Sequence, residues 1–144
     1  MKFILVAATL VALVSLPVAA ESTYSGSAKT RTVLDTTTNV AGQTLEWPHG
    51  APAKATIMEI DIPPGGDTGW HKHPVPLFGY VISGTLTIHF ADGSKKSFST
   101  GQGFAEARDI VHDGHNDGAE PLKFVVFIAG EKGVNYTEKQ STPK

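Results

Sequence analysis

Short runs of β-type residues, separated by turn residues every few positions, constrain the fold of this chain more than any other feature. No stretch shows a long helical period, and the sequence contains no internal repeat. Many short strands with frequent turns are typical of a β-sandwich or a β-barrel. We therefore expect an all-β fold, with strands at 31–38, 43–47, 54–62, 78–82, 85–90, 95–99, 103–107 and 123–129.

Two of these segments predict more than their own strand. Asp92-Gly93 lies between two β-type runs and predicts a tight hairpin, because this pair tolerates the positive φ that such a turn demands. The segment 123–129 is apolar without alternation, so we expect both of its faces to be covered. The barrel interior would cover one face, and a second sheet or a second subunit, hence a homodimer, would cover the other.

The N-terminal region has the pattern of a secretory signal peptide at residues 1–20. Lys2 precedes an apolar run, and small residues stand before Glu21. A membrane anchor is the alternative, but Ser15 and Pro17 interrupt the run, which falls short of the ~20 residues that a span needs. We expect a periplasmic or secreted protein, without a membrane contact after cleavage. The remaining boundaries would be a flexible lead-in at 21–30, one domain at 31–137 and a flexible tail at 138–144.

Charge and composition exclude several classes of partner. The chain has 12 basic and 14 acidic residues, a net charge of −2, which argues against nucleic acid and anionic membranes as partners. Cysteine is absent, so disulfides and thiolate ligands play no part. No Ser-His-Asp, Cys-His or phosphate-loop pattern stands out, and a small molecule is the expected ligand.

Three histidines carry the candidate chemistry. His71 and His73 are two residues apart, so in a strand their side chains point to the same face and could share one ion. His112, four residues before Asn116, could supply a third imidazole from a neighbouring strand. Such a set would hold a divalent transition metal, Fe, Mn, Ni or Zn, and leave coordination positions open.

Two motifs around these histidines resemble those of the cupin superfamily. The run 65–84, GGDTGWHKHPVPLFGYVISG, is similar to the first motif, with Gly-x₅-His-x-His and a terminal glycine. The run 101–116, GQGFAEARDIVHDGHN, is similar to the second, which ends His-x₃-Asn. The resemblance implies a cupin-type double-stranded β-helix, or jelly-roll barrel, of the small single-domain bacterial kind, with the metal bound inside.

The sequence departs from the family pattern at two places. Leu77 stands where the first motif has its glutamate ligand, and Ala107-Arg108-Asp109 replaces the Pro-x-Gly of the second. Glu106 is the candidate substitute: facing inward it would complete a site of three histidines and one carboxylate, and facing outward it would be a solvated acid. Small bacterial cupins resemble this chain in having a glutamate there.

Other residues have weaker predicted roles. We expect an apolar pocket lined by Leu77, Phe78, Tyr80 and Phe104, with Trp70 near its entrance. Arg108 is interpreted as a loop residue paired to Asp109 or Asp113, or else to a carboxylate ligand. His115 is assigned to a loop, while His49 and His89 are interpreted as structural or solvated.

These features predict an exported metal-binding protein. The first hypothesis is a metal-dependent oxidoreductase of the dioxygenase type that acts on a small molecule, since the cupin thiol and diketone dioxygenases are similar in using three histidines. The alternative is a non-catalytic module that binds a metal or a small ligand. A third hypothesis is a structural barrel whose histidines have no ligand.

Overall fold

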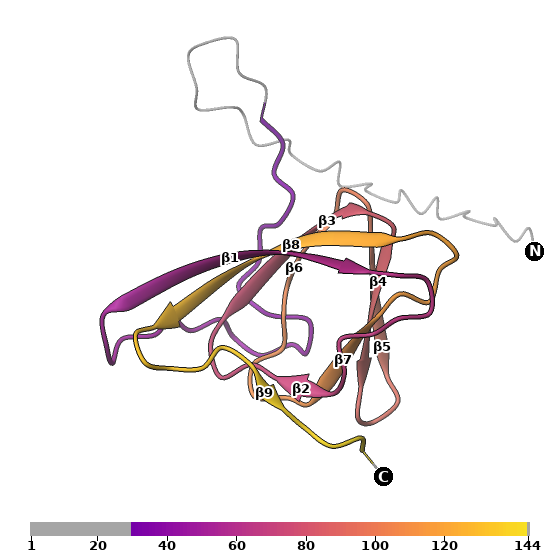
Figure 1. Cartoon of the computed structure of the whole chain (residues 1–144). Coiled ribbons are helices and arrows are strands. Elements are labelled where there is room, and N and C mark those ends of the chain that lie inside the picture. The colour runs from indigo at the N-terminus through magenta and orange to yellow at the C-terminus, as the bar shows by residue number, and fades with distance from the viewer. Residues whose placement is uncertain (1–29, 144) are drawn as a thin grey trace, which may run out of the picture. The chain divides into compact units, whose positions relative to one another are not determined.

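Two antiparallel β-sheets form the fold (Figure 1). The computed structural model describes residues 30–143, and within them the residues from Val33 onward form one compact unit. One sheet has the strand order β1-β8-β3-β6 and the other β5-β4-β7-β2-β9. The strands are β1 (Ala53–Ile62), β2 (His71–Lys72), β3 (Leu77–Ser83), β4 (Thr85–Phe90), β5 (Lys95–Ser99), β6 (Gly103–Ala105), β7 (His112–His115), β8 (Leu122–Glu131) and β9 (Glu138–Lys139).

The pairing of strands distant in sequence creates the barrel interior. β8 pairs with β1 on one side and β3 on the other, while β7 lies between β4 and β2. Register in the second sheet places His71 directly opposite His112. The all-β jelly-roll prediction is confirmed, because two sheets with such crossovers are the double-stranded β-helix arrangement.

Alternation along the strands fills the interior with apolar side chains. On β4, Leu86, Ile88 and Phe90 are buried, as the pattern predicts. On β3, Gly79 allows the Phe104 ring to lie close to the backbone, since any Cβ there would overlap the ring. The residues of the hydrophobic core cluster, from the strands and from the loops next to them, are Ile62, Val75, Leu77, Val81, Leu86, Ile88, Phe90, Phe104, Ala107, Leu122, Phe124, Val126 and Ile128.

The hairpin between β4 and β5 is confirmed. Gly93 has φ +84°, a left-handed conformation that glycine adopts without strain. Phe90 donates its N–H to the carbonyl of Ser94 at 2.9 Å, and Asp92 accepts the N–H of Ser94 at 2.9 Å. This local closure fixes the register of the two strands.

Two strand predictions near the N-terminus are wrong. Segments 31–38 and 43–47 form no extended strand, and only an isolated bridge joins Thr38 to Thr44. The reason is local: the side chain of Asn39 accepts the N–H groups of Ala41 and Gln43, which folds the chain into a turn.

A short strand lies at the start of the segment predicted to be a flexible tail. Glu138–Lys139 form β9, which pairs with β2, and Gln140 donates its N–H to the carbonyl of Trp70 at 2.8 Å. The polar composition of residues 138–144 predicts a solvated segment. The open edge of β2 offers this segment backbone hydrogen-bond partners, which composition does not reveal.

The outer face of β8 is only partly covered. Phe127 is 40% exposed and its partner Ile57 on β1 is 71% exposed, while Phe124 and Val126 point inward. Over residues 30–143 no second sheet lies on this face, so that version of the prediction is wrong; coverage by a second subunit stays a prediction.

The predicted signal peptide, and the lead-in up to residue 29, lie outside the described residues. Within the described part of the chain, no helix is long and apolar enough to cross a membrane.

Candidate metal centre

Three imidazole rings meet inside the barrel. His71 lies on β2, and His73 comes directly after the end of this strand. His112 is the first residue of β7, the strand that pairs with β2 in the same sheet. The ring centroids are 4.6 to 5.2 Å apart, and the residues are only 8%, 5% and 0% exposed. The structure therefore brings together the three histidines that the motif spacing selects.

Backbone carbonyls fix the orientation of each ring. A carbonyl can only accept, so each Nδ1 must carry the hydrogen, and in the neutral ring Nε2 keeps its lone pair. The Nδ1 atoms of His71, His73 and His112 donate to the carbonyls of Gly69, Tyr136 and Ile110 at 2.6, 2.7 and 2.8 Å. When neutral, all three rings thus present the same unprotonated nitrogen, Nε2, to the interior.

Glu106 points inward, which answers the question that the sequence leaves open. Its side chain is 10% exposed, with Oε1 3.0 Å from Nε2 of His112 and Oε2 3.6 Å from Nε2 of His73. Its backbone N–H donates to the carbonyl of Leu77 at 2.8 Å. Glu106 directly follows β6 and is hydrogen-bonded to Leu77. Its carboxylate therefore lies beside the position where the family motif has its glutamate.

The convergence of these groups leaves acceptors facing acceptors. Nε2 of His71 lies 3.2 Å from Nε2 of His73, and neither nitrogen has a hydrogen to donate in the neutral ring. Nε2 of His112 is close to Glu106 but off the direction of a hydrogen bond; within residues 30–143 it is the buried side-chain polar atom without a hydrogen-bond partner. Such a cluster requires a cation, either a proton or a metal ion, at its centre.

The pKa values of Glu106, His73 and His112 depend on one another. Burial acts to raise the pKa of Glu106, but the contact with His112 and the charges of the three histidines outweigh burial and hold it below its usual value. Burial lowers the pKa of His73, which Glu106 only partly offsets. Burial also acts to lower the pKa of His112, yet the short approach of Glu106 raises it.

Four residues can accordingly hold a metal ion. One ligand atom from each of His71, His73, Glu106 and His112 lies within 4.8 Å of all the others. Three neutral imidazoles and one carboxylate suit the divalent Fe, Mn, Ni and Zn ions. The buried, unpartnered Nε2 of His112 and the fixed tautomers fit a metal better than they fit a purely structural cluster.

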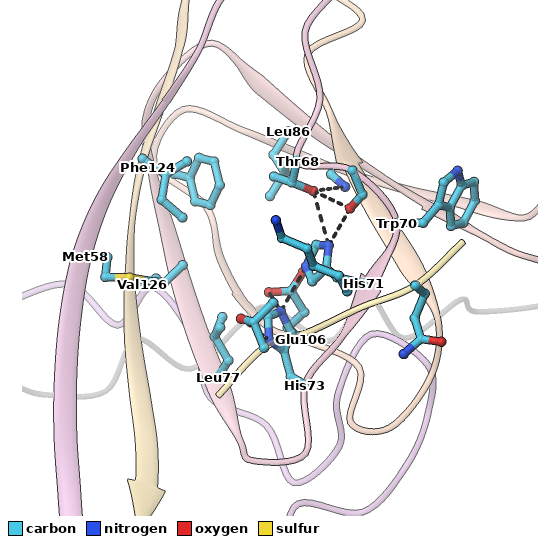
Figure 2. A pocket seen from close by; sticks show the side chains of 16 residues that line it. Met58, Thr68, Trp70, His71, His73, Leu77, Leu86, Glu106, Phe124 and Val126 are labelled. Carbon is cyan, nitrogen blue, oxygen red and sulfur yellow. Dashed lines mark hydrogen bonds and ion pairs between the residues drawn. The ribbon is translucent and has the colours of Figure 1, made fainter. Parts of the chain in front are cut away.

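A pocket with a volume of about 430 Å³ opens beside three of the four ligands, His71, His73 and Glu106 (Figure 2). Leu77 and Trp70 line it as predicted, but Phe78, Tyr80 and Phe104 do not. Phe104 is buried against Gly79, and Phe78 packs on Trp47 with ring centroids 5.6 Å apart. The apolar wall of the pocket instead consists of Met58, Ile60, Leu77, Leu86, Phe124 and Val126.

The C-terminal segment contributes residues that the sequence analysis missed. Thr137, Lys139 and Gln140 line the pocket, and the carbonyl of Tyr136 orients His73. No local signal marks these residues, since their place depends on the pairing of β9 with β2.

The remaining predicted residues are not among the four ligands of this centre. His49 is exposed, and His115 lies at the end of β7 rather than in a loop. Arg108 approaches Asp109 and Glu46 at 3.6 and 3.5 Å, and does not pair with Asp113.

Two motif positions outside the ligand set have clear structural roles. Asp109 has φ +56°, in the left-handed region that the family motif fills with glycine. Asn116 is 1% exposed and donates its side-chain amide to the carbonyls of Ile62 and Glu120, which closes the loop after β7.

Comparison with known proteins agrees with this arrangement. Residues 58–128 match the family model described as Cupin_2, cupin domain. No curated protein sequence matches the chain.

Solved structures share the fold at low identity. A protein with a double-stranded β-helix domain from Klebsiella pneumoniae subsp. pneumoniae MGH 78578 is 23% identical, with a TM-score of 0.50, over 64% of this chain and 90% of that one. The polyketide cyclase RemF from Streptomyces resistomycificus is 21% identical, with a TM-score of 0.51, over 65% and 66%. A chain from the study of the DMSP lyases RdDddP and RnDddQII is 18% identical, with a TM-score of 0.50, over 60% of this chain but 44% of that one. Residues 58–128 thus match the cupin-domain family model, and the solved structures share the double-stranded β-helix fold with this chain.

Proposed function

We propose that this protein binds one divalent transition metal through His71, His73, His112 and Glu106, and that it is a metal-dependent oxidoreductase of the dioxygenase type. The observation that carries the proposal is the convergence of three Nε2 atoms and a carboxylate, with every Nδ1 already committed to a carbonyl. A redox-active ion held there would supply open positions at which dioxygen and a chelating small molecule react.

The pocket supports a small and partly apolar substrate. Met58, Phe124 and Val126 form an apolar wall on one side of the ligands (Figure 2). Lys139 lies at the pocket and could attract an anionic group on the substrate. A volume of about 430 Å³ is within the range of small-molecule sites.

The lining residues also limit the chemistry. Apart from His71, His73 and Glu106, which are assigned to the metal, Lys139 is the titratable residue among those that line the pocket. A catalytic acid–base pair independent of the metal is therefore not available within the described lining. This observation favours metal chemistry, or else the alternative of a non-catalytic module that binds a metal or small ligand.

Metal analysis of the purified full chain tests the first part of the proposal. Near-stoichiometric Fe, Mn, Ni or Zn is expected in the wild type and in His49→Ala, whose exposed histidine serves as a control. His71→Ala should lose the metal bound inside. Metal-free protein that also refuses all four ions would contradict the proposal and leave a structural barrel.

Oxygen consumption then separates the enzyme from the binding module. The metal-loaded protein is supplied with a panel of thiols, diketones and flavonols while dissolved oxygen is recorded. Uptake that disappears in His71→Ala supports a dioxygenase, and absence of uptake across the panel favours the binding module.

Export is a separate proposal, and it rests on the N-terminal sequence alone. We expect cleavage after Ala20, so that the protein recovered from the periplasm or medium begins at Glu21. N-terminal sequencing of the fractionated protein tests this, and an intact Met1 in the cytoplasmic fraction would contradict it.

A further inference from the structure

A second cluster of potential ligands lies on the outer face of the sheet that carries His112. β4 and β7 are antiparallel neighbours, with Thr87 opposite His115 and His89 opposite Asp113 (Figure 1). Because side chains alternate along a strand, His112 points into the barrel and His115 points outward. The outer face of this strand pair therefore brings His89 and His115 together.

The two outer rings share one carboxylate. His89 and His115 stack with centroids 3.9 Å apart and an angle of 9° between their planes. Oδ2 of Asp117 lies 3.1 Å from Nε2 of His89, and Oδ1 lies 3.9 Å from Nδ1 of His115. Asp117 thus offers one oxygen to each ring.

A buried carboxylate determines which nitrogen of His115 is free. Oδ2 of Asp113 accepts from Nε2 of His115 at 3.1 Å, and Oδ1 of Asp113 accepts the hydroxyl of Thr68 at 3.1 Å. The side chain of Asp113 is 5% exposed, so this contact is held in place. In the neutral ring, Nδ1 of His115 is then an acceptor, and it faces a second acceptor, the carboxylate of Asp117. A histidine whose other nitrogen donates to a carboxylate, as His115 does to Asp113, is typical of metal-binding histidines.

We infer that His89, His115 and Asp117 form a second site, on the surface, for a borderline divalent ion such as Zn²⁺. One ligand atom from each lies within 4.8 Å of the other two. Ligand atoms bound to one Zn²⁺ at about 2.0–2.2 Å are roughly 3–3.5 Å apart, so the site closes by small movements. With two nitrogen ligands and one oxygen ligand, a fourth coordination position is left for water, as in open zinc sites.

Exposure allows the movements that binding requires. Nε2 of His89 donates its hydrogen to Oδ2 of Asp117 at 3.1 Å, because a carboxylate can only accept. His89 must therefore lose this hydrogen and tilt, and Asp117 must turn toward His115, for all three to share an ion. Their side chains are 17% and 49% exposed, whereas the ring of His115 is held by Asp113. Lys95, whose Nζ is 3.9 Å from Oδ2 of Asp117, is the cation that competes for this carboxylate.

Calorimetric titration of the metal-free full chain with Zn²⁺ tests the inference at neutral pH. The wild type should bind in two classes, and the double variant His89→Ala/His115→Ala should lose about one equivalent. His49→Ala, which removes an exposed histidine elsewhere, should lose none. Wild-type stoichiometry in the double variant, or an equal loss in the control, would overturn the inference.

Two further variants keep this result separate from the core site. Asp117→Asn changes one exposed oxygen and should weaken the outer class at least about tenfold without affecting the fold; an unchanged affinity would overturn the inference. His71→Ala should abolish the inner class and leave the outer one. If the only Zn²⁺ that binds is lost in His71→Ala and survives in the double variant, the outer site is wrong and the inner site stands.

Discussion

Strand β7 presents a histidine cluster on each face, and the two clusters differ in how their rings are held. Inside, the ligand side chains of His73, His112 and Glu106 are at most 10% exposed, and every ring donates to a backbone carbonyl. Outside, only His115 has a buried anchor, and Asp117 is 49% exposed. The backbone therefore preorganises the inner site, while the outer site must rearrange to bind.

The largest difference is expected between truncations on the two faces. His112→Ala removes a fully buried ring and should lower the free energy of unfolding by about 2–4 kcal/mol, as other core truncations do. His115→Ala on the outer face should cost less, because its ring is 25% exposed. Denaturant unfolding in the presence of a chelator measures both, and equal losses would contradict the contrast.

Removing the inner carboxylate should weaken metal binding without a comparable effect outside. Glu106→Gln is expected to reduce the inner-site affinity at least about tenfold, because a neutral amide replaces the only anionic ligand. Glu120→Gln, an exposed residue, is the matched control. Competition with a chromophoric chelator measures the change, and unchanged affinity would show that Glu106 is not a ligand.

The pH dependence of the metal-free protein should follow the lowered pKa of Glu106. Because this pKa lies below its usual value of 4.5, the ionised carboxylate stabilises the fold above pH 4.5, and that contribution is lost as pH falls through the folded-state pKa. The stability difference between wild type and Glu106→Gln should therefore shrink below pH 4.5. Unfolding curves at a series of pH values test this, and a difference that grows toward acid would refute it.

Thr68 contacts both clusters, so its removal should affect both. Its hydroxyl donates to Asp113 at 3.1 Å, accepts the N–H of Gly114 at 2.9 Å and lies 3.5 Å from Nδ1 of His71. Thr68→Val should cost about 1–2 kcal/mol of stability and weaken Zn²⁺ binding at both sites. Thr137→Val removes a hydroxyl 3.3 Å from Nδ1 of His73 and should affect the inner site alone. Titration of both variants decides whether Thr68 connects the clusters.

The smallest effect is expected from the competing cation of the outer site. Lys95→Ala removes an exposed ion pair with Asp117 and should strengthen outer Zn²⁺ binding about two- to fivefold. Lys96→Ala, the adjacent exposed lysine, should change nothing. A weaker outer site in Lys95→Ala would mean that Asp117 is positioned by the lysine rather than blocked by it.

Local sequence signals were sufficient for part of the fold and part of the site. The hairpin at Asp92-Gly93 and the inward alternation of β4 depend on neighbouring residues, and the structure has both. The spacing of His71 and His73 implies a shared face at any register, because strand periodicity alone requires it. The expected strands at 31–38 and 43–47 are absent, in contrast, because the side chain of Asn39 accepts two backbone N–H groups and holds the chain in a turn.

The sequence by itself determined an all-β fold and selected three histidines that could share an ion, while its resemblance to the cupin motifs implied a jelly roll. Only the tertiary structure decided that Glu106 faces them, that residues 138–140 lie beside the pocket, and that His89 meets His115. Each of these depends on which strands pair and in what register, and such long-range pairing is set by the packing of the whole core rather than by any local pattern.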